Sequence, residues 1–218
     1  LSNDPQGKHI PAYLFEAAEH LVKRKTEITD NLNSLIKNVR KVKEIIKSQQ
    51  LYTMNETHRD LVQISEIIEN AIEINNAGLE RFKIEVIREY GDLEKVTIDK
   101  HRLLQIFVSI IDNAQQALTE SPNEPKILTI STRRTDSKKI RIEITDNGIG
   151  IKPEDRTKIF KQGFTTKPEG HGFGLHSCML TAKDLHGSIN VQSKGINQGT
   201  TVTLELPLAE IEVKNESR

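Results

Sequence analysis

The chain has 218 residues, enough for one or two domains, and its 31 lysines and arginines balance 31 aspartates and glutamates, so bulk charge gives no reason to expect a nucleic acid or an anionic membrane as partner. The single cysteine, Cys178, excludes an intramolecular disulfide and fits a reducing compartment. No apolar run approaches the roughly 20 residues that span a bilayer, and no signal peptide is visible. Because the chain begins at Leu1 rather than Met, we expect a fragment of a longer protein, with a further domain or a membrane anchor upstream.

The N-terminal region has the pattern of a long helix. Residues 12–77 contain neither glycine nor proline, and within them apolar residues recur at alternating steps of four and three, interrupted only by Lys25. The members of this seam are Leu14, Ala18, Leu21, Ile28, Leu32, Leu35, Val39, Val42 and Ile46. A helix of about 40 residues, about 60 Å long, cannot bury such a stripe alone. We therefore expect a dimer, built on one continuous helix or on a hairpin that turns near residues 29–31.

After residue 57 the pattern changes to mixed strands and helices. The alternation of apolar residues predicts strands over residues 61–64, 82–90, 127–132, 139–146, 188–193 and 200–206. Helical spacing and capping residues predict helices over residues 66–76 with Ser65 as N-cap, 99–118, 153–160 and 175–185. Because the two kinds of element mix without strict alternation, we expect an α/β sandwich with helices on one face of a sheet.

Two glycine-rich elements indicate a nucleotide site. Asp146-Asn-Gly-Ile-Gly150 follows a buried strand, and Gly170-His-Gly-Phe-Gly174 opens the helix that begins near Leu175. A carboxylate at a strand end is placed to accept from an exocyclic amine such as that of adenine. Glycines let backbone N–H groups approach phosphates closely, and a helix N-terminus adds a favourable dipole.

Three further features agree with a nucleotide site, and each also has a simpler structural interpretation. Asn113 interrupts the apolar face of helix 99–118, and its amide oxygen suits a Mg²⁺ that already carries phosphate oxygens; alone, it reads as a buried asparagine bonded to backbone. The polar loop from Phe160 to Lys167 suits a lid whose lysine reaches a phosphate, or an ordinary surface loop. Thr200 offers a hydroxyl to the adenine end or belongs to a β-turn.

Together these elements resemble the motifs of the GHKL (Bergerat) ATP-binding fold of sensor histidine kinases, type II topoisomerases, ninety-kilodalton chaperones and mismatch-repair ATPases. The Asn113 helix resembles the N-box, residues 146–150 the G1 box, residues 160–164 the F-box and residues 170–174 the G2 box. The resemblance covers residues 58–208, and the preceding helices look like the dimerisation module of histidine kinases.

The resemblance implies an α+β chain with two domains. Residues 1–57 would form a helical dimerisation region, and residues 58–218 an ATP-binding α/β sandwich with a mixed, mainly antiparallel sheet. It implies that Asn113 binds Mg²⁺ and that Asp146 binds adenine. The other residues that it places at the ATP site are Asn147, Gly148, Ile149, Gly150, Phe160, Lys167, Gly170, His171, Gly172, Phe173, Gly174, Leu175 and Thr200.

One position separates the branches of this superfamily. Members that hydrolyse ATP resemble one another in having a Glu one helical turn before the Mg²⁺-binding Asn, where it acts as general base on water. This chain has Ser109 there, which is no competent base at neutral pH. The resemblance therefore favours phosphotransfer to a protein acceptor over ATP hydrolysis.

The phosphoacceptor is the part of the pattern that the chain does not match. Histidine kinases carry a His followed at once by Glu or Asp on the dimerisation helix, and His9, His20 and His58 all lack that neighbour. Residues 35–50 resemble a kinase subgroup that has a His where this chain has Lys41, and lysine cannot become phosphohistidine. His9 precedes Asn113 at a spacing that ordinary kinases show, so it is the first acceptor candidate, and His20 and His58 stay open as alternatives. Lys41 marks the position that the acceptor His has in the resembling subgroup.

We expect the cytoplasmic core of a two-component sensor histidine kinase. It would be a homodimer that moves the γ-phosphoryl of ATP·Mg²⁺ to a histidine and then to an aspartate of a response-regulator receiver domain, with no nucleic acid involved. Two alternatives stay open. One is a pseudokinase, an ATP-gated dimer without autophosphorylation; the other is a serine protein kinase of the anti-sigma-factor type, against which the long helix argues.

Overall fold

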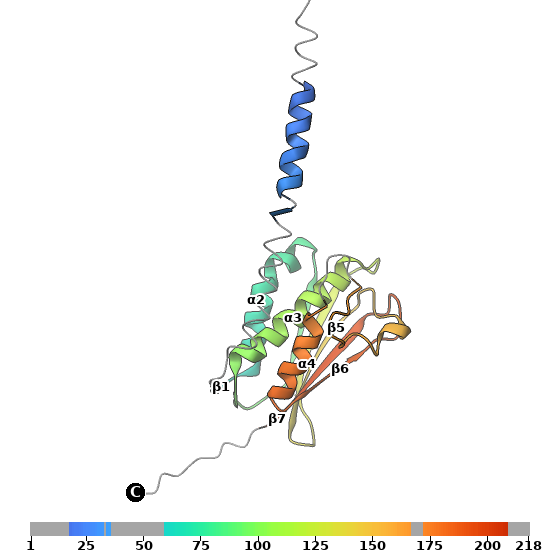
Figure 1. Cartoon of the computed structure of the whole chain (residues 1–218). Coiled ribbons are helices and arrows are strands. Elements are labelled where there is room, and N and C mark those ends of the chain that lie inside the picture. The colour runs from blue at the N-terminus through green and yellow to red at the C-terminus, as the bar shows by residue number, and fades with distance from the viewer. Residues whose placement is uncertain (1–17, 33, 36–58, 167–171, 209–218) are drawn as a thin grey trace, which may run out of the picture. The chain divides into compact units, whose positions relative to one another are not determined.

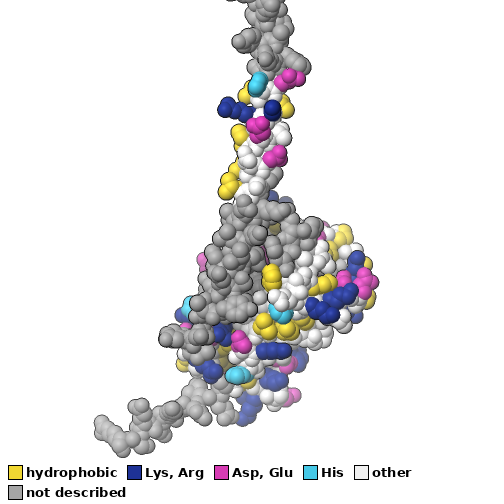
Figure 2. All heavy atoms as spheres, viewed as in Figure 1, with side chains coloured by type: hydrophobic (Ala, Val, Ile, Leu, Met, Phe, Trp, Pro, Cys, Tyr) yellow, Lys and Arg dark blue, Asp and Glu magenta, His cyan; other side chains and the backbone are white. Residues whose placement is uncertain are grey.

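The computed structural model describes residues 18–32, 34–35, 59–166 and 172–208, and the chain divides into two units, Leu1–Thr57 and His58–Arg218. In the first unit, residues 18–32 and 34–35 are helical, and no turn forms at residues 29–31. Hydrophobic side chains lie exposed along this helix (Figure 2), namely Leu21, Val22, Ile28, Leu32 and Leu35. The two ends of the predicted seam, Leu14 and the part from Val39 to Ile46, lie outside the described residues. Within the described parts, no helix has both the length and the apolar character needed to cross a bilayer.

The second unit is built on a five-stranded sheet (Figure 1). Its strands, in spatial order, are β2 (Glu85–Tyr90), β4 (Ile127–Arg134), β5 (Lys139–Asp146), β7 (Thr200–Pro207) and β6 (Ser188–Gln192). Only β2 and β4 run parallel, while the other three pairings are antiparallel, which confirms the mixed, mainly antiparallel sheet. A separate antiparallel pair joins β1 (Asp60–Val62) to β3 (Val96–Ile98), a strand that the sequence analysis missed.

Three helices cover one face of the sheet, as expected (Figure 1). They are α2 (Ile64–Arg81), α3 (Lys100–Thr119) and α4 (Gly174–Asp184), and α3 packs against both of the others. Alternate residues of β5, such as Ile140, Ile142 and Ile144, join Phe107 of α3 in one buried core. Each such side chain contributes roughly 1.5–3 kcal/mol by leaving water, so the core fixes α3 on the sheet.

Some helix bounds agree with the local sequence signals, whereas others are set by packing. The Asp99 carboxylate caps α3 by accepting from the backbone N–H groups of His101 (3.1 Å) and Arg102 (3.0 Å). The cap predicted at Ser65 is wrong, because α2 begins at Ile64 with Gln63 as N-cap. Buried isoleucines at the start of α2 and Leu79 near its end extend it beyond the predicted range, to Arg81. The helix predicted from Pro153 shrinks to the 3₁₀ turn η2 (Pro153–Asp155).

Candidate nucleotide-binding site

Asp146 forms one end of the site. It is the last residue of β5, where it pairs with Leu128 on one side and with Thr200 on the other, and only 6% of it is exposed. The backbone N–H of Gly148 donates to its Oδ1 at 2.8 Å. Burial raises the pKa of the Asp146 carboxyl from its ordinary 3.8 to about 6, although the backbone of Gly148 and Thr200 opposes the rise. A ligand amine that reached this buried carboxylate would therefore form a strong hydrogen bond.

The turn after Asp146 presses against the C-terminal part of α3. A Cβ atom at Gly148 would lie 2.6 Å from the carbonyl carbon of Ala117, so only glycine fits. The next N–H, that of Ile149, donates to the Ala117 carbonyl oxygen at 3.1 Å. Asn113 lies one helical turn before Ala117, on the same face of α3. The G1-like turn and Asn113 therefore share one side of the helix.

The start of α4 meets the same side of α3. A Cβ atom at Gly174 would lie 3.3 Å from Ser109 Oγ and 3.7 Å from Asn113 Nδ2. The residue before it, Phe173, caps α4 without a side-chain hydrogen bond. The first backbone N–H groups of a helix have no partner within it, and with the helix dipole they attract anions. Asn113 thus lies next to a helix start whose backbone N–H groups suit an anion.

The segment after η2 is joined to the start of α4. The Gly163 N–H donates to the Gly172 carbonyl oxygen at 3.2 Å, and His176 Nδ1 lies 2.9 Å from the Phe160 carbonyl oxygen. Gly172 has a φ of +67°, and a Cβ atom there would overlap the backbone of Gly163. The segment that resembles the F-box is therefore in direct contact with the segment that resembles the G2 box.

The sequence analysis did not predict that the loop of residues 193–199 is hydrogen-bonded to the turn after Asp146. Ser193 Oγ accepts from the Ile151 N–H at 2.9 Å and donates to the Gly199 carbonyl oxygen at 2.7 Å. The Asn197 N–H donates to the Ile149 carbonyl oxygen at 2.7 Å. Glycine and asparagine in residues 195–199 signal a turn, but nothing local shows which segment the turn covers.

Two asparagine side chains, Asn123 and Asn147, add hydrogen bonds around this loop and the turn after Asp146. Asn123 Nδ2 donates to the carbonyl oxygens of Asn147 (2.8 Å) and Asn197 (3.0 Å), so it joins both loops. The Asn147 amide accepts from the Ile127 N–H at 2.8 Å and donates to the Pro125 carbonyl oxygen at 2.7 Å. The Asn147 side chain therefore anchors the segment before β4, and its contact with a nucleotide stays a prediction.

The structure brings most of the predicted site residues together around α3 and the ends of β5 and β7. Thr200 opens β7 beside Asp146 rather than forming an isolated turn, and Leu175 follows Gly174 in the first turn of α4. Five predicted residues lie outside the described part of the chain, namely His9, Lys41, Lys167, Gly170 and His171.

The oxygen ligands that the protein offers near α3 suit a Mg²⁺ ion coordinated mainly by water and phosphate oxygens. Among the described residues, no three His, Cys, Asp or Glu side chains converge as a metal site. Mg²⁺ commonly keeps several waters and takes one or two protein oxygens beside substrate phosphates. A single amide oxygen from Asn113 fits that mode of binding.

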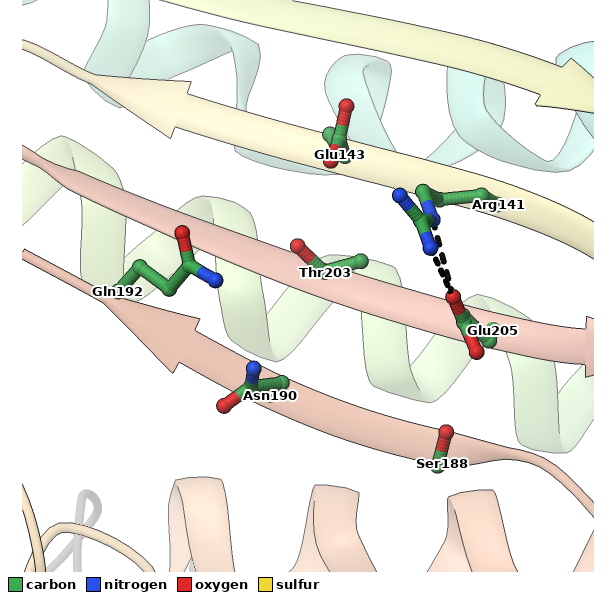
Figure 3. Close-up of a pocket in the computed structure, with 7 residues that line it drawn as sticks. All are labelled: Arg141, Glu143, Ser188, Asn190, Gln192, Thr203 and Glu205. Carbon is green, nitrogen blue, oxygen red and sulfur yellow. Dashed lines mark hydrogen bonds and ion pairs between the residues drawn. The ribbon is translucent and has the colours of Figure 1, made fainter.

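A polar depression of about 250 Å³ lies elsewhere, on the sheet face that the helices leave uncovered (Figure 3). Its lining includes an ion pair in which Arg141 Nε (2.9 Å) and Nη2 (2.6 Å) donate to Glu205 Oε1. It is lined by side chains of β5, β7 and β6, namely Arg141, Glu143, Ser188, Asn190, Gln192, Thr203 and Glu205. Because the glycine motifs gather against α3 on the other face, this depression is separate from the candidate site.

Comparison with known sequences points to one family. The model of the histidine kinase-, DNA gyrase B-, and HSP90-like ATPases matches residues 98–210, slightly more than half of the chain. The sensor protein TdiS of Thauera aromatica is 25% identical over 193 residues, which cover 87% of this chain and 35% of TdiS. The chain thus spans about a third of that relative's length.

Comparison with solved structures gives the same fold. Full-length ShkA in complex with AMPPNP matches with a TM-score of 0.62 and 22% identity, over 70% of this chain and 31% of that one. The histidine kinase ThkA in complex with the response regulator protein TrrA matches with a TM-score of 0.63 and 22% identity, over 78% of this chain and 48% of that one.

Proposed function

Because the chain belongs to the family of histidine kinase-, DNA gyrase B-, and HSP90-like ATPases, we propose that it is the ATP-binding core of a two-component sensor histidine kinase. The observation that carries this proposal is the meeting of a buried carboxylate, an asparagine amide and a helix N-terminus on one side of α3. The sensor protein TdiS among its relatives and the fold shared with the AMPPNP complex of ShkA support it.

In this proposal each part of the site serves one part of ATP·Mg²⁺. Asp146 accepts from the adenine amine, with Thr200 beside it. The N–H groups at the start of α4 face the phosphates, which Gly172 and Gly174 allow to approach closely. Asn113 holds Mg²⁺, which supplies charge neutralisation on the transferring phosphoryl group. The protein contributes mainly positioning and a fixed electrostatic environment.

Ser109 favours transfer to a protein over hydrolysis. Its hydroxyl faces Gly174, one helical turn before Asn113, where a general base would activate water. A serine hydroxyl is not a competent base at neutral pH. We propose that the phosphoryl group goes to a histidine and then to a receiver-domain aspartate, and the complex of ThkA with TrrA supports such a partner.

A pseudokinase is the second candidate, favoured by the missing His-acidic pair. The residues that follow His9, His20 and His58 are Ile10, Leu21 and Arg59. His9 and the Lys41 position stay the proposed acceptor positions. Without a competent acceptor, the chain would bind ATP and signal through its partner alone.

Incorporation of radiolabelled γ-phosphate from ATP·Mg²⁺ into the chain separates these candidates. We expect acid-labile label, at least about tenfold lower in Asn113→Ala, which corresponds to about 1.4 kcal/mol. Arg141→Ala, on the uncovered face of the sheet, is the matched control and should keep the label. Saturable ATP binding without label would favour the pseudokinase, and acid-stable label on a partner serine would favour the serine kinase.

A further inference from the structure

We propose that His176 is a positioning residue of the nucleotide site, which holds the Phe160 carbonyl oxygen through its Nδ1–H and so fixes the phosphate end of the site. The inference rests on the proposed function, because it assigns His176 a role in binding the ATP phosphates.

The contact determines which ring nitrogen of neutral His176 carries the hydrogen. His176 Nδ1 lies 2.9 Å from the Phe160 carbonyl oxygen in a partly buried position. A carbonyl oxygen only accepts, so Nδ1 carries the hydrogen, and Nε2 is the acceptor in the neutral ring. Protonation to imidazolium adds a hydrogen at Nε2 and leaves the Nδ1–H in place. The contact with Phe160 therefore persists in both charge states.

A second bond joins the same pair of segments. Gly163 N–H donates to the Gly172 carbonyl oxygen at 3.2 Å, while His176 holds Phe160. Residue 160 is joined to 176 and residue 163 to 172, so the two segments run in opposite directions. Ile159, beside Phe160, is buried. The buried Ile159 and these two hydrogen bonds therefore set the position of the segment along the start of α4.

The residues fixed in this way are those that meet the phosphate end of the proposed site. Gly174, two residues before His176, lies against Ser109 and Asn113 of α3. Asp146, at the adenine end, accepts separately from the Gly148 N–H, and Ser193 holds the turn after it by accepting from the Ile151 N–H. Loss of the His176 bond should therefore weaken phosphate binding and leave the adenine end unchanged.

Three substitutions at this position test the proposal in the full chain. The Nδ2–H of asparagine lies where Nδ1–H of histidine lies, whereas the amide of glutamine reaches the position of Nε2. We expect His176→Asn to bind ATP within about twofold of the parent, and His176→Gln and His176→Leu to bind it about tenfold more weakly, or roughly 1.4 kcal/mol. Adenosine should bind all four chains equally. Both affinities are measured by displacement of a fluorescent ATP analogue, and thermal unfolding confirms that each variant is folded.

Other outcomes would overturn the inference. Rescue by glutamine but not by asparagine would show that Nε2 makes the important contact. Equal losses of ATP and adenosine affinity would show a purely structural role, and unchanged affinities would show none.

A readout that needs no nucleotide keeps this inference distinct from the proposed function. Nitrogen NMR of the parent should show the Nδ1–H tautomer for His176, and amide exchange at Gly163 should rise in His176→Leu but not in His176→Asn. If the parent binds neither ATP nor the analogue, the proposed function fails while these two measurements still test the bond. The opposite tautomer, or unchanged exchange at Gly163 in His176→Leu, would overturn the His176 assignment.

Discussion

Asp146 combines burial with ionisation, and that combination has a cost in stability. Its pKa is about 6 in the folded chain against an ordinary 3.8, and burial is the main cause. A carboxyl whose pKa rises on folding destabilises the folded state in its ionised form. The penalty is absent below about pH 4 and complete above about pH 6, as these two pKa values require. The residue that the resemblance assigns to adenine therefore weakens the empty protein at neutral pH.

We predict that Asp146→Asn stabilises the ligand-free chain at pH 8 by on the order of 2–3 kcal/mol and has little effect at pH 4. The amide removes the charge but keeps an oxygen that can accept from the Gly148 N–H. Urea unfolding of both chains at the two pH values measures the difference.

The same variant tests the ligand assignment. An amine donor favours the ionised carboxylate, so ATP affinity of the parent should fall as pH drops below about 6, by up to about tenfold per unit. Asp146→Asn should bind ATP weakly and lose this pH dependence. A parent affinity that is flat from pH 5 to 8 would contradict the assignment.

Among the elements, the loops around the site depend on glycines for two different physical reasons. Gly150 has a φ of +68°, and a Cβ atom there would overlap the Gly195 carbonyl oxygen of the covering loop. Gly163 has a φ of +79°, but nothing lies within 4 Å of its missing Cβ. The first glycine is needed for backbone conformation and close approach, and the second for conformation alone.

We predict that Gly163→Ala lowers the free energy of unfolding by about 1 kcal/mol, the cost of a left-handed backbone for alanine. Gly150→Ala should cost several times more, because the opposing atom belongs to backbone and cannot move without displacing residues 195–199. Chemical denaturation of the two variants provides the comparison. Equal losses would mean that the covering loop yields easily and does not hold the site.

At the scale of the whole molecule, the described helix of the first unit carries an exposed apolar stripe. Leu21, Ile28, Leu32 and Leu35 are each more than half exposed. Their spacing follows the heptad seam of the sequence, and such a stripe is buried when helices associate. The homodimer inferred from that seam stays a prediction, and the exposed residues identify where it can be tested.

We predict that the full chain is a dimer at micromolar concentration and that Ile28→Lys shifts it to monomer, because a charge in the seam would have to be buried. Thr26→Lys, on the opposite side of the same helix, is the matched control and should stay dimeric. Sedimentation equilibrium measures both. A monomeric parent chain, or equal effects of the two lysines, would contradict dimerisation through this stripe.

Features that depend on neighbours along the chain could be predicted from the residues alone. The helix predicted from residue 99, its apolar spacing and the alternation in β5 each lie within one element, and the structure confirms all three, with Asp99 as the cap residue just before α3. The glycine motifs also stand in short runs, and for that reason the family could be inferred from residues 113–174 before any contact was known. Local stereochemistry and hydrophobic periodicity act over a few residues, so they can be recognised in the amino-acid sequence.

Which segments contact one another became clear from the three-dimensional fold and not from the sequence. The parallel pairing of β2 with β4, the short strand β3, and the start of α2 at Ile64 rather than Glu66 all depend on packing partners far along the chain. The bonds that fasten the site have the same character, since Asn123 reaches Asn197 across 74 positions and His176 reaches Phe160 across 16. A polar side chain can bond to any backbone group that the fold places beside it. Its sequence neighbours do not specify that partner, because the partner is chosen by the burial of the common core.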